Sequence, residues 1–518
     1  MSHSFDFIII GAGLNGLTAA AYLAKAGKKV LVLERREIIG GAAVTEEIFP
    51  GFKLDTVTHN VAGFDANIAR DLNLAQYGLE LIQPDVSVFA PQRDGGAITL
   101  WRDDAKTADS IRVFSPNDAT KWRAFRERMA KLARVLDSIH ALTPPSITTT
   151  NPAELFSLGK LGLQVRGLGK RDMPEFLRAL PMPIAELLDY EFENDLLKGA
   201  LAAGGIHGLM LGPLGVGTTY NFLRGVNDGV VRATTFVRGG VGKLADALAS
   251  AAKARGAEIR TNAHVVQIRV RDQRATGVVL ASGEEINAPQ IISSADPKQT
   301  FLQLIDPIEL DPTFCARIRN IRTRGVFAKM NLALDALPNF KNATEEQLRG
   351  TISISPNMMY LERAYDDAKY GNISQQPYLE ITIPTLLDPS RAPQGKHVLS
   401  VWMQYVGERL ETGDLRLKNE QLGDLVIRTL SDYAPNLQSL VLHSQVLSPC
   451  DLQEIYSLPN GDINHGQTTL DQFLFMRPVP HFANYRTPLE GLFFCGAGAH
   501  PGGIPCAAGR NAAREILK

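Results

Sequence analysis

The chain has 518 residues, and at roughly 150 residues per domain this length predicts about three structural units. Its 45% hydrophobic and 21% charged residues are typical of a folded globular protein and exclude long disorder. The net charge of −1 excludes an overall field that attracts nucleic acid; four cysteines are too few for a disulfide scaffold, and the absence of C-x-x-C spacing excludes a thiol–disulfide redox centre of the usual pattern.

The chain opens on a β-α-β pattern. Residues 5–10 and 28–33 are rich in β-branched side chains and predict two buried strands, and residues 17–24 predict a helix of small residues between them. Residues 11–16 form a G-x-G-x-x-G sequence at the turn between the first strand and the helix. This arrangement is typical of a dinucleotide-binding unit.

Each glycine of this turn has a physical role at a phosphate site. Gly11 permits the tight bend, Gly13 lets the backbone approach a pyrophosphate, and Gly16 lets helix and strand pack closely. The amides at the start of the helix, at Leu14 and Asn15, are free to donate, and the positive end of the helix dipole favours a phosphate. The sequence therefore predicts a bound dinucleotide.

The residues after the second strand indicate which dinucleotide is bound. Glu34 stands at the strand end, where a carboxylate accepts hydrogen bonds from ribose hydroxyls and disfavours the 2′-phosphate of NADP. Arg35 follows, and the pair Gly40-Gly41 comes shortly afterwards. This pair resembles the extended motif of glutathione-reductase-type FAD proteins, with Ala42 in place of the arginine usual in phytoene desaturases and amine oxidases. We therefore expect these residues to bind FAD.

Residues 121–136 predict an amphipathic helix. Its apolar face carries Trp122, Phe125, Met129, Leu132 and Leu136. Its other face carries Lys121, Arg123, Arg126, Arg128, Lys131 and Arg134. A basic face of this kind lies in solvent or docks on anionic lipid, so peripheral membrane contact is one open alternative.

Residues 199–223 contain no charged side chain, but they include seven glycines and Pro213. The stretch is long enough to cross a bilayer, yet its glycines and proline would make a poor spanning helix. We expect instead the buried, irregular wall of a pocket.

The middle of the chain predicts more strands but no second dinucleotide site. Residues 258–270, 278–286 and 291–296 alternate like strands. Gly240 and Gly242 precede a helical stretch, but no third glycine and no suitably spaced acid follow them. With a single dinucleotide site, electrons would leave to oxygen, a quinone or another acceptor.

The C-terminal region carries two further motifs. An H-G-x-x-x-L-D-Q sequence followed by R-P lies at residues 465–478, and C-G-A-x-x-H-P-G-G lies at residues 495–503. With the N-terminal unit, these motifs resemble the phytoene dehydrogenase-related family of FAD-dependent oxidoreductases, in its phytoene desaturase and carotene ketolase branch. The chain departs from that family at Ala499, where threonine is common, and at residues 504–506, which are less glycine-rich.

The resemblance implies an α/β fold: a glutathione-reductase-type, Rossmann-like FAD-binding domain with an inserted α+β substrate domain. The expected FAD-binding domain is discontinuous and takes residues 1–70, 231–304 and 486–518. The expected substrate domain takes residues 71–230 and 305–485. The resemblance also implies that Val265 lies near the adenine, and that backbone amides at Gly496, Ala497, Gly502 and Gly503 meet the flavin.

The implied reaction is hydride transfer between flavin N5 and an apolar, isoprenoid- or lipid-like substrate, in a desaturation or related oxidation. Two alternatives stay open: a flavin amine oxidase-like enzyme, and a non-catalytic FAD-bearing regulatory or interaction protein. The histidines lack metal-ligand spacing, so no metal is expected. His59 and His500 are weak candidates for functional contacts to the flavin, and the catalytic residues are otherwise unknown.

No targeting segment is obvious. The expected location is cytoplasmic, at a membrane periphery in one alternative, or the mitochondrial matrix in a eukaryote, and the oligomeric state stays open. Cys495 and Cys506 lie near the expected flavin, and we expect them to be packing residues rather than a redox disulfide or a flavin thioether.

Overall fold

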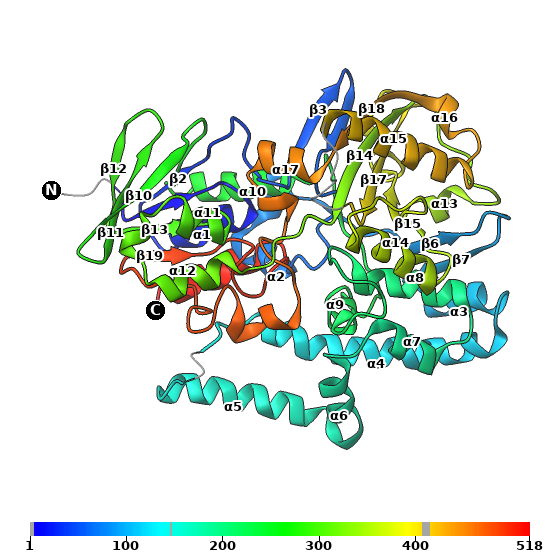
Figure 1. Cartoon of the computed structure of the whole chain (residues 1–518), viewed down its shortest axis with the longest axis horizontal. Coiled ribbons are helices and arrows are strands. Elements are labelled where there is room, and N and C mark those ends of the chain that lie inside the picture. Colours follow the sequence, from blue (N-terminus) through cyan, green and yellow to red (C-terminus); the bar gives the residue numbers. More distant parts are fainter. Residues whose placement is uncertain (1–4, 146–147, 407–414) are drawn as a thin grey trace.

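The computed structural model describes residues 5–145, 148–406 and 415–518. Residues 1–4 of the expected FAD-binding domain, and residues 146–147 and 407–414 of the expected substrate domain, lie outside the described residues. Figure 1 shows two β-sheets side by side, with a group of helices below the larger one. The fold is mixed α/β.

A five-stranded parallel sheet contains the N-terminal β-α-β unit. Its order is β19 (Leu492–Phe494), β13 (Gln290–Ser293), β1 (Phe7–Ile10), β2 (Val30–Leu33) and β9 (Glu258–Arg260). The central strands β1 and β2 are buried along their whole length, as their continuous apolar sequences predict. Three helices pack together beside this sheet: α1 (Leu14–Lys25), α10 (Gly242–Lys253) and α18 (Ala507–Ile516).

A seven-stranded mixed sheet forms the other half of the molecule. Its order is β18 (Val441–Leu447), β14 (Phe327–Leu334), β17 (His397–Gln404), β16 (Leu379–Thr382), β15 (Thr351–Ile354), β6 (Val86–Pro91) and β7 (Ala97–Trp101). All eight residues of β14 are buried, so the polar side chains of Lys329 and Asn331 lie inside the core.

Three small sheets complete the β-structure of the described residues. One is antiparallel and consists of β10 (Val265–Arg271), β11 (Arg274–Leu280) and β12 (Glu285–Asn287). The others are the pairs β3 (Thr45–Phe49) with β4 (Phe52–Asp55), and β5 (Leu81–Ile82) with β8 (Phe236–Val237). The alternation noted after residue 258 therefore corresponds to real strands.

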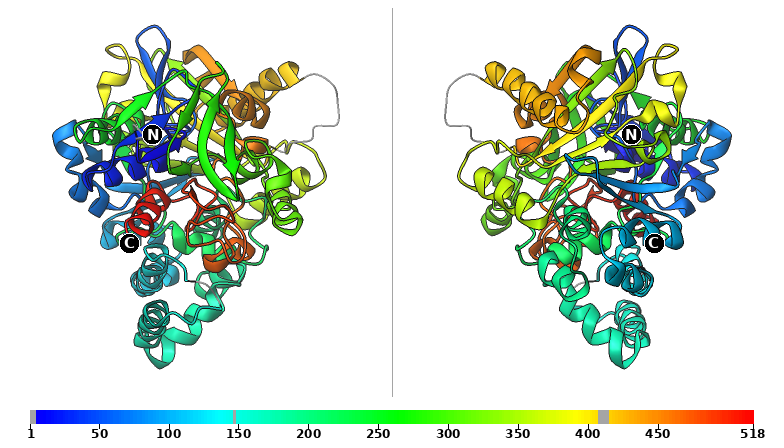
Figure 2. Two further views of the ribbon diagram at one scale, coloured as in Figure 1. Left: turned by 90° about the vertical axis from the view of Figure 1, so that its left-hand side faces the viewer. Right: turned by 90° about the vertical axis from the view of Figure 1, so that its right-hand side faces the viewer.

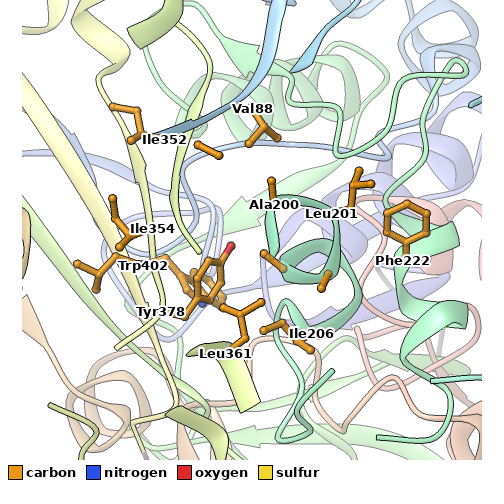
Figure 3. Packing of buried hydrophobic residues seen from close by; sticks show 14 of the residues in the cluster. Val88, Ala200, Leu201, Ile206, Phe222, Ile352, Ile354, Leu361, Tyr378 and Trp402 are labelled. Atoms are coloured by element: carbon orange, nitrogen blue, oxygen red, sulfur yellow. The ribbon is translucent and has the colours of Figure 1, made fainter. Parts of the chain in front are cut away.

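The uncharged stretch 199–223 folds as two short helices joined by the irregular segment 207–217. They are the last part of α8 (Asp195–Ile206) and most of α9 (Thr218–Arg224). Figure 3 shows Ala200, Leu201 and Ile206 of α8 between sheet residues such as Ile354 on one side and Phe222 of α9 on the other. Among the described residues, no helix combines the length and the apolar character needed to cross a membrane.

The basic helix expected at residues 121–136 is part of α4 (Pro116–His140). Its predicted apolar face is buried. Four of its basic side chains are paired with acids: Arg123 with Glu127 (2.9 Å), Arg126 with Asp104 (2.7 Å), Arg128 with Glu191 (2.5 Å) and Lys131 with Asp172 (2.5 Å). Because these four basic side chains have acidic partners, the helix presents little uncompensated positive charge. Three of the four acids come from other helices.

The remaining helices surround these layers. They are α2 (Ala66–Leu72), α3 (Asp104–Arg112), α5 (Pro152–Gly167), α6 (Gly169–Ala179), α7 (Ile184–Glu191), α11 (Pro297–Leu302), α12 (Pro312–Arg319), α13 (Glu345–Leu348), α14 (Met358–Lys369), α15 (Leu415–Ser431), α16 (Leu437–Leu440) and α17 (Pro449–Tyr456). Both views of Figure 2 place residues 152–179, the helices α5 and α6, at the narrow lower end of the molecule.

Candidate functional site

The glycine turn between β1 and α1 has the geometry that its sequence predicts. Gly11 has a φ of +91°, which favours glycine. A Cβ on Gly16 would lie 2.2 Å from the carbonyl oxygen of Gly11, so this position needs glycine for helix–strand packing. A Cβ on Gly13 would meet no atom within 4 Å. Gly13 therefore faces open space, as a backbone that approaches a ligand should.

Glu34 closes the other end of this unit. Its carboxylate accepts hydrogen bonds from the backbone amides of Ala12, at 2.8 Å, and Arg36, at 2.9 Å. Both bonds hold the carboxylate at the wall of the cavity described next. Because a carboxylate has about four acceptor sites, Glu34 can still accept from the hydroxyls of a ribose.

A large cavity, which we call the cofactor cavity, runs from Glu34 to the C-terminal glycines and has an empty volume of about 1390 Å³, including its open mouth. Most of the expected contact residues line it: Gly11, Gly13, Leu14, Asn15, Glu34, Arg35, Gly40, Gly41, Ala42, Val265, Ala497 and Gly503. Gly16, Gly496 and Gly502 do not line it. At each of them a Cβ would collide with other atoms of the protein; on Gly502, for example, it would lie 2.3 Å from Nε of Arg477.

The cofactor cavity also has polar residues that the motifs did not indicate. Asp296 lines it and caps α11, accepting from the amide of Lys298 at 2.6 Å. Burial, and to a smaller degree the charge of Asp462, raises the pKa of Asp296 to about 7. Its Oδ2 atom is buried and has no hydrogen-bond partner. An orphaned oxygen of this kind fits a hydroxyl donor, such as those of the ribityl chain of FAD.

A second cavity adjoins the first and shares four wall residues with it: Asn60, Asn464, Gly503 and Ile504. Its empty volume is about 840 Å³, including open solvent. Small and apolar residues form part of its wall, but the wall also contains His207, Arg224, Arg232 and Glu380. We call it the substrate cavity, because a molecule there would lie next to a bound cofactor.

Glu380 of β16 is the centre of a buried polar network in this wall. Its Oε2 atom lies 3.0 Å from Nη2 of Arg232, 3.1 Å from the hydroxyl of Tyr378 and 3.5 Å from Nδ1 of His207. Burial alone would raise the pKa of Glu380, but His207, His59 and Arg232 together hold it below its ordinary value. Glu380 is therefore a carboxylate that can orient a histidine.

His207 is the most exposed member of this network in the wall of the substrate cavity. It directly follows α8, its ring stacks on Trp402 with centroids 4.6 Å apart, and its side chain is 38% exposed. The sequence motifs did not single it out. The one signal in the sequence was that it is the single histidine of the uncharged stretch 199–223.

The two histidines that the sequence did single out lie elsewhere. His59 is buried behind Glu380, with Nε2 at 3.7 Å from Oε1 and Nδ1 at 2.8 Å from Nζ of Lys329. Burial and the charge of Lys329 lower the pKa of His59 to about 4, and burial lowers the pKa of Lys329 to about 7. His500 is buried with Nε2 at 3.0 Å from the carbonyl oxygen of Ile139. Neither ring lines the two cavities.

The cysteines and the possible metal ligands add no further site. Cys495 and Cys506 are free and buried, and burial raises the pKa of each thiol to about 12, so both stay protonated. Among the residues that the structure describes, no three His, Cys, Asp or Glu side chains gather where they could hold a metal ion.

Comparison with known proteins relates this arrangement to characterised chains. Residues 14–517 match the family of flavin containing amine oxidoreductases. Pyridine nucleotide-disulfide oxidoreductase domain-containing protein 2 of Mus musculus is 38% identical over 543 residues, which covers 99% of this chain and 93% of that protein. One of the subunits of limonene dehydrogenase from Castellaniella defragrans is 31% identical, with coverage of 99% and 94%. A neurosporene-forming phytoene desaturase of Rhodobacter capsulatus is 26% identical, with coverage of 97% and 91%.

Solved structures share the fold. An oxidoreductase from Methanosarcina mazei superposes with a TM-score of 0.62 at 18% identity, covering 99% of both chains. Putrescine oxidase bound to putrescine superposes with a TM-score of 0.59 at 16% identity, also covering 99% of both chains.

Proposed function

The chain belongs to the family of flavin containing amine oxidoreductases, and from this premise we propose that it oxidises an apolar, isoprenoid- or lipid-like substrate. The protein is an FAD-dependent oxidoreductase. When bound, FAD would supply a two-electron acceptor for a hydride from carbon, as a desaturation or related oxidation requires. Oxygen, a quinone or another acceptor then removes the electrons in this proposal.

The observation that carries the proposal is the position of His207 in the wall of the substrate cavity beside the carboxylate of Glu380. Loss of a hydride from one carbon leaves a cation unless a neighbouring carbon or heteroatom gives up a proton. His207 takes that proton in our proposal, because it lines the cavity and Glu380 lies 3.5 Å behind its Nδ1 atom. Nδ1 of His207 makes no hydrogen bond to the residues that the structure describes, but the carboxylate beside it would stabilise the imidazolium that forms.

Relatives support an apolar substrate. Two of them are named for limonene and for phytoene, which are isoprenoid hydrocarbons. Gly63 and Ala233 are small residues of the substrate cavity wall, and a Cβ on Gly63 would meet no atom closer than 3.9 Å, so this part of the wall leaves space for a hydrocarbon.

An amine oxidase is the second candidate, since putrescine oxidase shares the fold. The charges of the substrate cavity speak against a cationic amine. Glu380 is the acid of its wall, and it is already paired with Arg232, whereas Arg224 has no acidic partner among the described residues. A polyamine would therefore meet positive charge that nothing compensates.

Anaerobic reduction of the bound flavin tests the proposal. Isoprenoids and acyl lipids should bleach the flavin absorbance, and polyamines should leave it unchanged. Mass spectrometry should then find the consumed lipid lighter by two hydrogens. Bleaching by polyamines alone would transfer the protein to the amine oxidases.

We further propose that α5, rather than α4, makes any contact with a membrane. Phe156 and Leu163 of α5 are 76% and 69% exposed, lie on one helical face, and have Lys160 and Arg166 nearby. Apolar side chains beside basic ones suit an anionic bilayer. Co-sedimentation with phosphatidylserine vesicles should fall when both apolar residues become serine, and it should not change for Arg123→Gln on α4.

A further inference from the structure

The substrate cavity contains a guanidinium without a counter-ion. Arg224, the last residue of α9, donates to the carbonyl oxygen of Gly502 and lies 3.5 Å from the side-chain oxygen of Asn221. No carboxylate of the described residues lies within 4.0 Å of it. Its Nε atom is buried and has no hydrogen-bond partner.

Arg232, in the wall of the same cavity, is by contrast hydrogen-bonded and paired with a carboxylate. It donates to Glu380 at 3.0 Å, to Tyr378 at 3.0 Å, to the carbonyl oxygen of Ala200 at 2.7 Å and to Ser353 at 3.1 Å. Every charge of the Arg232–Glu380 pair is therefore compensated. The contrast leaves one uncompensated positive charge in the wall, which belongs to Arg224.

A guanidinium out of water without an anion is costly, and burial lowers the pKa of Arg224 accordingly. Polar side chains nearby could share an anion with it. Thr468 bonds to Asn221 at 3.3 Å, and the hydroxyl of Thr234 is buried without a partner in the same wall. A single free charge matches a monoanion better than a doubly charged phosphate, and the fork of a guanidinium matches the two oxygens of a carboxylate.

We infer that the substrate cavity recognises a carboxylate, so that the substrate is an apolar carbon chain ending in a carboxylic acid group held by Arg224. The inference rests on the proposed function and deepens it. Arg224 contacts Gly502, and a Cβ on Gly503, which lines both cavities, would lie 3.1 Å from its Nη2 atom. The acid group would therefore be anchored at the junction of the two cavities, and the chain would extend along the wall that contains His207.

Equilibrium binding to the FAD-loaded protein tests this without turnover. Octanoate and octanamide have the same chain and differ in charge, and binding of either should perturb the flavin absorbance. We expect octanoate to bind at least about tenfold more tightly than octanamide. Arg224→Gln should abolish this preference, and Arg224→Lys should retain part of it because the positive charge remains. The exposed Arg123→Gln is the matched control and should bind like the wild type.

Equal affinity of the wild type for octanoate and octanamide would overturn the inference, and so would a preference that survives Arg224→Gln. If Arg224→Gln does not retain FAD, the relative affinities of the wild type and of Arg224→Lys for octanoate and octanamide still test the inference. The proposed function fails separately: a carboxylate preference that depends on Arg224, in a protein whose flavin no lipid reduces, would support the anion site and reject the oxidation.

Discussion

The two cavities of this protein are built from different parts of the chain. The cofactor cavity takes about a third of its wall, including Gly11, Gly13, Gly40 and Gly41, from the short segments 11–15 and 33–43. The substrate cavity takes its charged groups from the end of α8, the end of α9 and strand β16, which are far apart in sequence. The first presents backbone amides and glycines to its ligand, together with the carboxyl groups of Glu34 and Asp296, whereas the second presents charged side chains that meet only in the folded protein.

The glycine turn gives the largest expected effect on the cofactor cavity. Gly13→Val should weaken FAD binding about 100-fold or more, because the new side chain would fill space that the backbone leaves for the pyrophosphate. The free energy of unfolding of the flavin-free protein should change by no more than about 1 kcal/mol, since a Cβ at this position meets no atom within 4 Å. Flavin absorbance and urea unfolding measure the two effects.

Gly16→Val is the matched partner of that variant. Its Cβ would lie 2.2 Å from the carbonyl oxygen of Gly11, so we expect a loss of about 3 kcal/mol of stability as well as of flavin. Equal damage to the unfolding free energy by both variants would contradict the distinction between a ligand-facing and a packing glycine.

Substitutions in the substrate cavity should lower the turnover rate and leave cofactor binding unchanged. His207→Asn should lower turnover with a substrate that reduces the flavin by about 100-fold or more, the usual contribution of a general base, and leave FAD retention unchanged. His443→Asn, at an exposed position on β18, is the control. Turnover within about twofold of the wild type in His207→Asn would remove this histidine from the mechanism.

The contrast between the cavities also explains what the sequence could predict. Strands β1 and β2 and helix α1 agree with the predicted unit to within a few residues, because glycine spacing and apolar runs act locally. Gly11 and Gly13 line the cofactor cavity for the same reason. The motif also predicted the packing role of Gly16, which agrees with the structure, since a Cβ there would lie 2.2 Å from the carbonyl oxygen of Gly11.

Features that depend on distant partners could not be predicted in this way. The apolar face of α4 is visible in the sequence, but the acids that neutralise Arg126 and Arg128 come from α3 and α7. His59 was a candidate for contact with the flavin but is buried behind Glu380, whereas His207 gains its carboxylate from β16 only through the fold. Side-chain constellations therefore need the tertiary structure.

The pH dependence of stability tests whether Asp296 is a cofactor-cavity residue with a buried, orphaned oxygen. Its pKa is raised to about 7 from 3.8, so the folded protein binds an extra proton between these values. This contribution to stability is present below about pH 4 and is lost as the pH rises through 7. Asp296→Asn keeps the cap of α11 and should remove this loss, about 4 kcal/mol, from the flavin-free protein.

Urea unfolding at several pH values between 4 and 8 measures this difference. The advantage of Asp296→Asn over the wild type should grow with pH across that range. Asp471→Asn, at an exposed position, should follow the wild-type curve. Parallel curves for Asp296→Asn and the wild type would mean that the carboxyl group is solvated in the flavin-free protein.

The smallest expected effect concerns Glu34, at the far end of the cofactor cavity. Its two carboxylate oxygens accept from two backbone amides, Ala12 at 2.8 Å and Arg36 at 2.9 Å. Glu34→Gln leaves one oxygen for these two donors and turns an NH₂ group toward the other. We expect FAD to bind about tenfold more weakly, which is about 1.4 kcal/mol, because both the local frame and the acceptor for the ribose weaken.

Titration of the flavin-free protein with FAD measures this change, with the exposed Glu37→Gln as control. The effect should be smaller than that of Gly13→Val, because an amide still accepts one hydrogen bond, whereas a side chain at residue 13 excludes the pyrophosphate altogether. An unchanged affinity in Glu34→Gln would mean that the ribose does not reach this carboxylate. The adenosine end of FAD would then have to lie elsewhere in the cofactor cavity, and the role given to the strand-end acid would be wrong even though the glycine turn still binds the phosphates.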